Sequence, residues 1–563
     1  MDLRIADDQP TEVERDAIES VAGPSGATVA DGRVVVRDRD LRHLLLPALA
    51  EVQSRVGWVS RGAMAEICRR LHVPPADAYG VATFYALIST EERPGRVAHV
   101  CDDIACAPAG GEALADALVK ALGASPGYAV HRSPCLGQCD RAPAVYLQRA
   151  AVDDDVVVHA TVDDVVARLD ATGTAAPETA SVTPGRLLDR LRDAAASDFA
   201  ALRAARAMGP GAVIDAVRDS GLVGRGGASF PTGIKWAAVA AAAGPRHLIC
   251  NADESEPGTF KDRVLLESAP AAVIESMAIA GTAIGAEHGW VYIRGEYPVA
   301  TRALHDAIAD ARARGALGDD VLGSGLRFDI EVRRGQGAYI CGEETALMES
   351  IEGHRGEPRN KPPFPTTHGL FGRPTVINNV ETLCNVLDIV HGGTPDSRLF
   401  CLSGDVARPG VIEAPLGTPL RELLDDAGAR TDDLRAVLLG GAAGSFVGPD
   451  LFDLPLDVES ARAHGLGLGS GVVMALGPDS DVARVVTRIA QFFRDESCGQ
   501  CVPCRVGVVR QQEALGRYLD GGRAREELTL LRDVDRVMTD ASICGLGQTA
   551  ASAIRSAIAL ELV

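Results

Sequence analysis

Eight of the thirteen cysteines fall into two groups that have the spacing of ligands. The first group combines C-x4-C with C-x3-C in Cys101, Cys106, Cys135 and Cys139. Each pair lies just after an expected strand, so two loops can converge on one site. Zinc sites usually contain C-x2-C pairs, whereas these wider loops favour four thiolates around a [2Fe–2S] cluster. Zinc and unligated thiols are the alternatives.

The second group lies near the end of the sequence, in and after the stretch DESCGQCVPCRVG. Cys498, Cys501 and Cys504 repeat every three residues, and Cys544 follows at a distance. Three thiolates at this spacing offer one face of a cubane, and the fourth closes it. A zinc ribbon needs two separated pairs, so the pattern predicts a [4Fe–4S] cluster.

A different chemistry is indicated by the glycine-rich loop GLVGRGGASFPTGIKW. Gly224, Gly226 and Gly227 let the backbone approach a ligand and present N–H groups to a phosphate. Ser229 takes the third glycine position of G-x-G-x-x-G, and residues 211–223 have a helical pattern rather than that of a strand. The loop therefore lacks the context of a Rossmann fingerprint, and an ordinary glycine turn is the alternative.

An aromatic side chain and a second polar loop follow. Phe230 precedes a rigid proline, and Thr232 is expected to cap the helix that begins near Gly233. After a short strand, HLIC, the stretch NADESEPGTFKDR supplies a cluster of polar side chains: Asn251, Asp253, Glu254, Ser255 and Glu256. A phosphate on the glycine loop and sugar hydroxyls on the acids together predict a nucleotide or a flavin.

Three expected strand ends carry glycine and acid together, namely NADESE, RGEY and GQGAYICGEE. Ligands of open α/β sheets bind beyond the carboxyl ends of the strands, so we expect one shared cofactor crevice. Glu343 and Glu344 by themselves would also suit a solvated helix N-terminus.

Downstream, a proline-rich turn holds Lys361 beside Phe364. An aromatic side chain on a stiff turn can stack on a planar ring, and packing within its own loop is the alternative. Asn378 and Asn379 offer the donors and acceptors that a flavin edge or a phosphate requires.

Composition limits the class of protein. The 563-residue chain carries a net charge of −21, which argues against nucleic acid or an anionic membrane as its main partner. It shows no secretory signal and no apolar run of the roughly 18 residues that span a membrane. We expect a cytoplasmic protein whose clustered cysteines are ligands rather than disulfides. Five scattered cysteines are expected to be buried apolar residues: Cys68, Cys250, Cys341, Cys384 and Cys401.

Five motifs, in this order, resemble the NADH-binding flavoprotein subunit of respiratory complex I and its relatives: GRGGASFPTGIKW, CNADESEPGTFKDR, GAYICGEE, PTVINNVETL and ESCGQCVPCRVG. The N-terminal 170 residues resemble its partner, the thioredoxin-like [2Fe–2S] subunit, so the two look fused in one chain. The resemblance covers nearly the whole sequence. It implies bound FMN, NAD(H), [4Fe–4S] and [2Fe–2S].

The expected fold class is a multidomain α/β protein. Its parts are an N-terminal helical bundle (1–95), a thioredoxin-like [2Fe–2S] domain (96–170), a linker (171–186), a Rossmann-like FMN/NAD(H) domain (187–395), a β-grasp-type (SLBB) domain (396–478) and a C-terminal helical [4Fe–4S] bundle (479–563).

The resemblance also implies site residues. By motif position, FMN would be surrounded by Gly224, Gly226, Gly227, Lys235, Asn251, Asp253, Ser255, Tyr339, Gly342, Glu343, Glu344, Asn378 and Asn379, with Glu254 in the same loop. NAD(H) would stack on the flavin between Phe230 and Phe364, near Glu256 and Lys361. Ser229 departs from the usual glycine of the loop.

The implied chemistry is hydride transfer between nicotinamide and flavin, followed by single-electron transfer to the [4Fe–4S] cluster. No side chain needs to act as an acid or base, because the protein supplies position and electrostatics; Glu256 would position the nucleotide. Acids near the ribose favour NAD over NADP, and the [2Fe–2S] centre would be a side store or a second exit.

The resemblance favours the diaphorase subunit of a molybdenum- or tungsten-dependent formate dehydrogenase that reduces NAD⁺. Hydrogenase flavoproteins with such an N-terminal extension often lack part of its cysteine set, whereas all four cysteines are present here. The expected partner is a catalytic subunit with further iron–sulfur centres, in a hetero-oligomer. A diaphorase of an NAD-reducing hydrogenase and a complex I subunit are the alternatives, and a non-catalytic scaffold or a zinc-stabilised redox sensor would be other classes.

Overall fold

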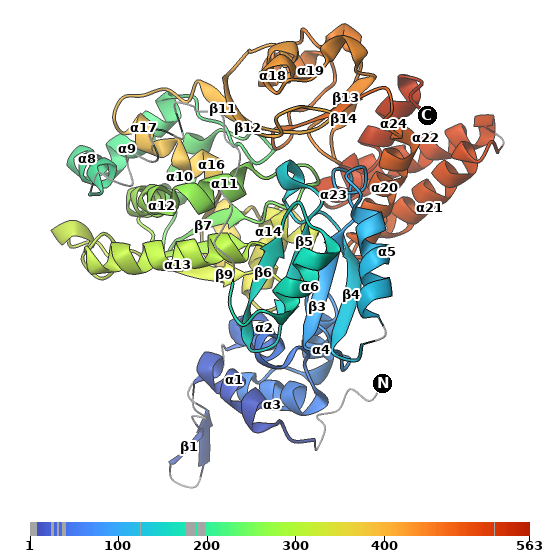
Figure 1. The fold of residues 1–563 in the computed structure, drawn as a ribbon. Coiled ribbons are helices and arrows are strands. Elements are labelled where there is room, and N and C mark those ends of the chain that lie inside the picture. The colour runs from blue at the N-terminus through green and yellow to red at the C-terminus, as the bar shows by residue number, and fades with distance from the viewer. Residues whose placement is uncertain are drawn as a thin grey trace.

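The computed structural model describes residues 8–23, 27–30, 33–36, 41–123, 125–174, 187, 189, 191, 198–522 and 524–563. The expected linker lies outside these residues from position 175 onward. Four sheets lie among helices, and the N-terminal helices and the C-terminal helices occupy different ends of the molecule (Figure 1).

The N-terminal part is helical, as expected, with a small hairpin. Its elements are α1 (Glu12–Ala22), β1 (Ala27–Ala30), β2 (Arg33–Val36), α2 (Leu45–Val56), α3 (Arg61–Leu71) and α4 (Pro75–Ala82). The Ser60 hydroxyl caps α3 by accepting the Ala63 N–H at 3.0 Å. After α4, the N–H groups of Ala86 and Leu87 donate to carbonyls of Gly337 and Gln336, which ties this part to the central sheet.

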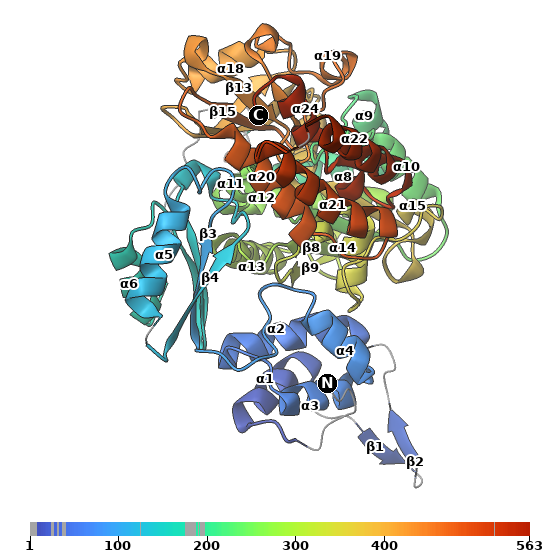
Figure 2. The same cartoon turned by 90° about the vertical axis from the view of Figure 1, so that its right-hand side faces the viewer.

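The next part is a four-stranded sheet with two helices on one face. Its elements are β3 (Arg96–Cys101), α5 (Gly111–Leu122), β4 (Tyr128–Ser133), β5 (Val145–Arg149), β6 (Val152–Val157) and α6 (Val162–Asp170). The strand order is β4-β3-β5-β6, with only β3 and β4 parallel. Helices α5 and α6 cover the face that points away from the rest of the molecule (Figure 2). The other face, which carries the cysteine loops, is turned inward.

A four-stranded parallel sheet with the order β10-β7-β8-β9 forms the centre. Its strands are β7 (His247–Ala252), β8 (His288–Ile293), β9 (Asp329–Arg334) and β10 (Thr375–Asn379). The motifs NADESE, RGEY and GQGAYICGEE lie at the carboxyl ends of β7, β8 and β9, which are parallel neighbours, so all three lie at one edge of the sheet. A shared cofactor crevice requires this placement. Around the sheet lie α8 (Ala200–Met208), α9 (Pro210–Asp219), α10 (Thr232–Ala241), α11 (Lys261–Ser268), α12 (Pro270–Ile284), α13 (Pro298–Ala313), α14 (Glu344–Ile351), α15 (Pro365–His368), α16 (Val380–Cys384) and α17 (Val386–Ile389).

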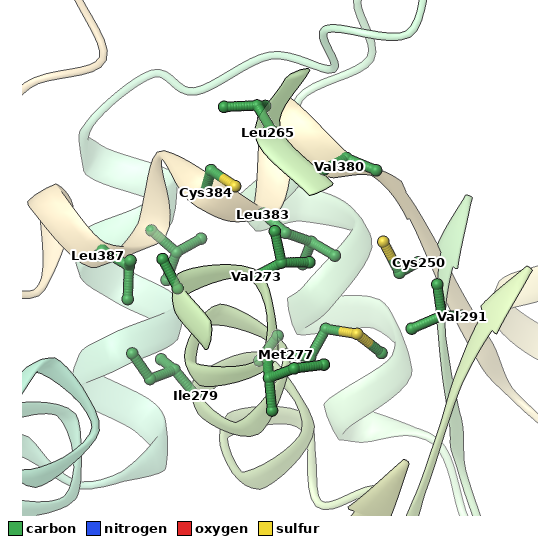
Figure 3. Close-up of a cluster of buried hydrophobic side chains, with 14 of the residues drawn as sticks. Cys250, Leu265, Val273, Met277, Ile279, Val291, Val380, Leu383, Cys384 and Leu387 are labelled. Atoms are coloured by element: carbon green, nitrogen blue, oxygen red, sulfur yellow. The ribbon is translucent and has the colours of Figure 1, made fainter. Parts of the chain in front are cut away.

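Helix α12 forms the core of this part and is apolar nearly all round. Met277 and Val273 lie between Cys250 of β7 and Cys384 of α16 (Figure 3). All five scattered cysteines are buried, as expected. Burial raises the pKa of the Cys68 thiol to about 11, so it is a packing residue rather than a reactive thiolate.

The last two parts complete the chain. A mixed sheet with the order β12-β11-β15-β13-β14 contains β11 (Ser397–Gly404), β12 (Gly410–Pro415), β13 (Ala436–Leu439), β14 (Ser445–Val447) and β15 (Val472–Leu476), with α18 (Leu420–Asp426) and α19 (Val458–Ala463). The end of the chain is helical: α20 (Val482–Asp495), α21 (Val502–Leu519), α22 (Ala524–Ala541), α23 (Gly545–Thr549) and α24 (Ser552–Ala559). Short 3-10 turns include Cys139–Arg141 and Tyr339–Gly342.

Within the described ranges, no single helix is both long and apolar enough to cross a bilayer. The pair α11 and α12 passes that test only when taken together, and the two helices meet at an angle of 98°. Both are buried in the core of the central part.

Candidate flavin and iron–sulfur sites

The glycine loop folds back on itself beside the end of β10. Gly224 N–H donates to the Phe230 carbonyl at 2.9 Å, which closes the loop. Gly227 has φ of +123° and Ser229 has φ of +50°, both in the left-handed region. A Cβ on Gly226 would lie 3.1 Å from the Cβ of Asn379. Gly226 and Gly227 therefore accept little beyond hydrogen, as a cradle for a phosphate requires.

Helix α10 begins at Thr232, and Pro231 is its N-cap. The expected Thr232 cap is wrong, because Pro231 already sets the turn with φ of −60° one residue earlier. The Thr232 hydroxyl is buried and has no hydrogen-bond partner in the described part of the chain.

Buried charged residues of α11 and α16 form a network next to the glycine loop. Lys261, which is fully buried, pairs with Asp262 at 2.7 Å and with Glu381 at 3.0 Å. The Asn379 amide donates to Asp262 at 2.5 Å. The Arg225 backbone N–H donates to the Thr382 hydroxyl at 2.9 Å, which joins the loop to α16. Buried charges paired in this way hold one geometry firmly.

The polar loop after β7 contacts the turn after β9. The Asn251 amide donates to the Gly342 carbonyl at 2.8 Å, and the Ser255 hydroxyl donates to Asp253 at 3.1 Å. Burial raises the pKa of Asp253 to about 8 and outweighs the opposing effect of Arg294. A Cβ on Gly342 would lie 3.3 Å from the Asp253 carbonyl. These three expected site residues of the loop and Gly342 thus lie together, as the expected cofactor crevice requires.

Glu254 differs from its neighbours because its carboxylate points into its own loop. It accepts the backbone N–H groups of Asp262 and Arg263, each at 2.8 Å, and hydroxyls of Thr259 and Tyr297. All of these bonds are internal, so Glu254 shapes the loop rather than offering its side chain to a cofactor.

Lysines and acids from three segments meet near the expected cofactor crevice. Lys361 pairs with Glu343 at 3.0 Å and with Glu344 at 2.6 Å. Lys235 lies 3.7 Å from Glu344 and donates to the Ile377 carbonyl. Glu343 also accepts N–H groups at the start of α14, which is the helix-capping role that its sequence position allows.

Two aromatic side chains near these lysines in the chain, Phe230 and Phe364, are exposed. Phe230 is 50% exposed and Phe364 is 56% exposed, although large apolar side chains are usually covered. Lys235 lies 5.9 Å from the centre of the Phe230 ring.

The side chain of Asn378, another expected site residue, is engaged within the protein. Its side-chain oxygen accepts a hydrogen bond from the indole N–H of the buried Trp236 at 2.8 Å.

Glu256 links the crevice to two other parts of the molecule. It accepts the Tyr339 hydroxyl at 2.5 Å and the Ala443 N–H at 2.8 Å. Burial raises the pKa of Glu256 to about 7, against the lowering effect of these two donors. Tyr339 in turn donates its N–H to Glu496, close to the second cysteine group.

The first cysteine group converges in the structure. Cys101, Cys106, Cys135 and Cys139 are all buried, and the sulfurs of Cys135 and Cys139 are 3.4 Å apart. Leu87 from the N-terminal part and Tyr146 of β5 pack against this site. A sulfur-only donor set in an apolar surrounding fits a [2Fe–2S] cluster.

The second cysteine group gathers at two helix starts. Cys501 precedes α21 and Cys544 precedes α23, and Cys504 lies in the first turn of α21. A Cβ on Gly547 would lie 2.9 Å from the Cys504 Cβ, so glycine allows the two helices to meet there. Cys498, Cys501 and Cys544 are partly exposed, unlike the first group. This donor set fits a [4Fe–4S] cluster.

The sequence motifs do not reveal the arginines that connect these sites. Arg294 donates to the Cys135 carbonyl at 2.6 Å, Arg263 donates to the Gly137 carbonyl at 2.9 Å, and Arg488 lies 3.2 Å from Asp102. Each contact spans more than a hundred residues of sequence, so no local pattern marks it. The one available signal was the position of Arg294 at the carboxyl end of a strand.

Comparison with known proteins gives matches along most of the chain. Family models match the Nuo51 FMN-binding domain at residues 217–388, a thioredoxin-like [2Fe–2S] ferredoxin at 33–172, the NADH-ubiquinone oxidoreductase-F iron–sulfur binding region at 484–560, and an SLBB domain at 399–443.

Individual relatives agree with these models. The F 2 subunit of the NADH-quinone oxidoreductase of Rhizobium meliloti is 43% identical over 395 residues, covering 67% of this chain and 93% of the relative. The F subunit of the same enzyme from Aquifex aeolicus is 45% identical, covering 64% and 86%. The HndC subunit of the NADP-reducing hydrogenase of Solidesulfovibrio fructosivorans is 43% identical, covering 62% and 74%. A structure of an NAD⁺-reducing [NiFe]-hydrogenase in the H₂-reduced state superposes with a TM-score of 0.81 at 34% identity, covering 93% of this chain and 91% of that chain.

The fold and the sites thus define an NADH-dependent oxidoreductase subunit that carries FMN, [2Fe–2S] and [4Fe–4S]. The chain belongs to the family of the NADH-quinone oxidoreductase F subunits, the complex I family, with a thioredoxin-like [2Fe–2S] domain in the same chain. The resemblance stated from the motifs is confirmed.

Proposed function

We propose that this chain is a diaphorase subunit that exchanges electrons between NAD(H) and a catalytic partner through its C-terminal cluster. The observation that carries the proposal is the difference in exposure between the two cysteine groups. The first group is wholly buried, whereas three of the four C-terminal cysteines are partly exposed. Electron exchange with another subunit needs a centre near the surface, and the partly exposed C-terminal group suits this requirement better than the buried first group.

The chain's own residues would bind and orient the reactants. The N–H groups of Gly226 and Gly227 would hold the FMN phosphate, with Lys235, Asn251, Asp253, Ser255, Gly342 and Asn379 around the cofactor. The bound flavin supplies hydride chemistry. Exposed Phe230 and Phe364 would flank the nicotinamide nucleotide, and Lys361, held by Glu343 and Glu344, would face its charge.

A surface beside the C-terminal cluster supports docking of a partner there. Val502 is 58% exposed and Val506 is 46% exposed on α21, next to Cys501 and Cys504. Exposed apolar side chains of this kind are typical of protein interfaces. We propose that the partner is the catalytic subunit of a molybdenum- or tungsten-dependent formate dehydrogenase, on the complete cysteine set of the N-terminal domain.

One observation favours a second candidate, an NAD-reducing hydrogenase. The superposition on the hydrogenase chain covers nearly the whole molecule, including the N-terminal domain. The two candidates differ in the metal of the partner and in the electron donor.

Purification of the native complex through a tag on this chain distinguishes them. A formate dehydrogenase partner predicts molybdenum or tungsten in the complex and formate-dependent NAD⁺ reduction. Nickel with hydrogen-dependent NAD⁺ reduction would replace that partner by a hydrogenase. A complex that reduces quinone with NADH would place the chain in a respiratory enzyme.

A further inference from the structure

The loops that carry the [2Fe–2S] ligands are held by arginines from other parts of the chain. Arg294 follows β8 of the central sheet, and its guanidinium donates to the Cys135 carbonyl at 2.6 Å. The same guanidinium donates to the Glu254 carbonyl at 2.7 Å, in the polar loop of the flavin crevice. Arg294 thus bridges one cluster loop and the flavin loop with one rigid group.

A second arginine, from the C-terminal helices, contacts the other ligand loop. Arg488 of α20 lies 3.2 Å from Asp102 and 3.7 Å from Asp103. Asp103 also accepts the Cys135 N–H at 2.9 Å, so it connects the two ligand loops to each other. Helix α20 leads into the C-terminal cysteine group, which places Arg488 between the two cluster regions.

A third arginine fixes the loop between Cys135 and Cys139. Arg263 donates to the Gly137 carbonyl at 2.9 Å and to Asp140 at 2.7 Å, and it is fully buried. Gly137 has φ of +67°, and a Cβ there would collide with the Tyr297 hydroxyl. The loop between Cys135 and Cys139 is therefore fixed against the central part.

The charge of these arginines matters because the surroundings are buried. Arg294 is 3% exposed, and the Arg488 side chain is 15% exposed. A [2Fe–2S] cluster with four thiolates gains one negative charge when it accepts one electron. Arg294 pairs with Glu296 at 2.9 Å, and Arg488 pairs with the two aspartates of the ligand loop. Loss of either arginine would leave uncompensated negative charge in a medium of low dielectric constant, which disfavours the more negative, reduced state of the cluster.

We propose that Arg294 and Arg488 are positioning residues for the [2Fe–2S] centre, which fix its two ligand loops to the flavin and [4Fe–4S] regions and favour its reduced state. The proposal rests on the family assignment, which supplies the cluster. It gives the fused N-terminal domain a defined electrostatic connection to both other redox sites.

The test is an EPR-monitored redox titration of the purified full chain. Arg294→Gln and Arg488→Gln are each expected to weaken reduction of the [2Fe–2S] cluster at least tenfold, which is 59 mV more negative for a one-electron couple. The [4Fe–4S] signal serves as the internal reference in the same sample.

Arg484→Gln is the matched control. Arg484 lies one turn before Arg488 on α20 and pairs with Glu112 of the same N-terminal domain, but its side chain is 47% exposed. Exposed ion pairs contribute little, so the equilibrium constant for reduction of the [2Fe–2S] cluster in this variant should stay within about twofold of wild type. The proposal would be overturned if Arg294→Gln and Arg488→Gln also kept this equilibrium constant within twofold of wild type.

Lysine variants keep the proposal testable if a glutamine variant fails to load its cluster. Arg294→Lys and Arg488→Lys retain the charge, so each should load iron and keep a potential closer to wild type than its glutamine counterpart. The assigned role of charge would be contradicted by a lysine variant whose [2Fe–2S] potential shifts as far as that of the glutamine variant. A lysine variant without any [2Fe–2S] signal would also contradict it. Absence of the [2Fe–2S] signal in wild type would instead contradict the cofactor content of the chain.

Discussion

Glu256 is the residue on which three parts of the molecule meet. Its carboxylate joins the polar loop after β7 to Tyr339 and to Ala443, which lies in the turn between β13 and β14. The substitution Glu256→Gln keeps the shape of the side chain but removes the negative charge to which these two groups donate hydrogen bonds. We expect weaker binding of NADH with FMN retained, measured by nucleotide titration and by flavin content. Unchanged nucleotide affinity would remove Glu256 from the nucleotide site.

The same substitution has a pH signature. Burial raises the pKa of Glu256 from 4.5 to about 7, so the folded state keeps a proton that the unfolded state loses. The contribution of Glu256 to stability therefore declines as the pH rises from 4.5 to 7 and stays low above pH 7. Glu256→Gln should gain up to about 3 kcal/mol relative to wild type between pH 5 and pH 8. Thermal unfolding of both proteins at these pH values measures it, and parallel curves would contradict the burial of the charge.

A substitution at Gly227 tests whether the glycine loop binds the FMN phosphate. Its φ of +123° is unfavourable for any residue with a Cβ. Gly227→Ala should lower FMN content at least tenfold while iron content stays near that of wild type, because both cysteine groups lie elsewhere. Gly211→Ala is the control, since a Cβ there meets nothing within 4 Å. Full FMN content in Gly227→Ala would mean that the phosphate is held elsewhere.

At the scale of elements, the segment that follows α4 covers the first cysteine group. Leu87 is 4% exposed and packs against Cys101, Cys106 and Leu136. Leu87→Ala should cost about 2–5 kcal/mol at this contact and should speed loss of [2Fe–2S] absorbance in air. Leu416→Ala, at a site that is 40% exposed, is the control. Equal rates of cluster loss in both variants would show that Leu87 does not seal the site.

Elements also show what sequence can and cannot predict. The cysteine groups, the glycine loop and the strand-end acids were predictable because each depends on local spacing. The expected cap at Thr232 was wrong because one proline outweighed a side-chain preference. The side-chain direction of Glu254 and the partners of Arg294 were not predictable, since they depend on segments that only the folded chain brings together.

At the scale of the whole molecule, the three expected cofactor regions lie next to one another. The polar loops lie at the carboxyl edge of the central sheet, the buried cysteine group is joined to them through Arg294, and the C-terminal cysteine group is joined to them through Tyr339 and Glu496. This arrangement suits a module that takes a pair of electrons at one site and passes them singly through the other centres. Under our proposal, the C-terminal group gives access to a partner.

Anaerobic addition of NADH to the purified chain, followed by visible and EPR spectroscopy, tests this account most directly. We expect bleaching of the flavin together with signals of a reduced [2Fe–2S] and a reduced [4Fe–4S] cluster. A sample that contains iron but shows no flavin bleaching would contradict the account, because the glycine loop would then hold no working flavin and the chain would act as a scaffold.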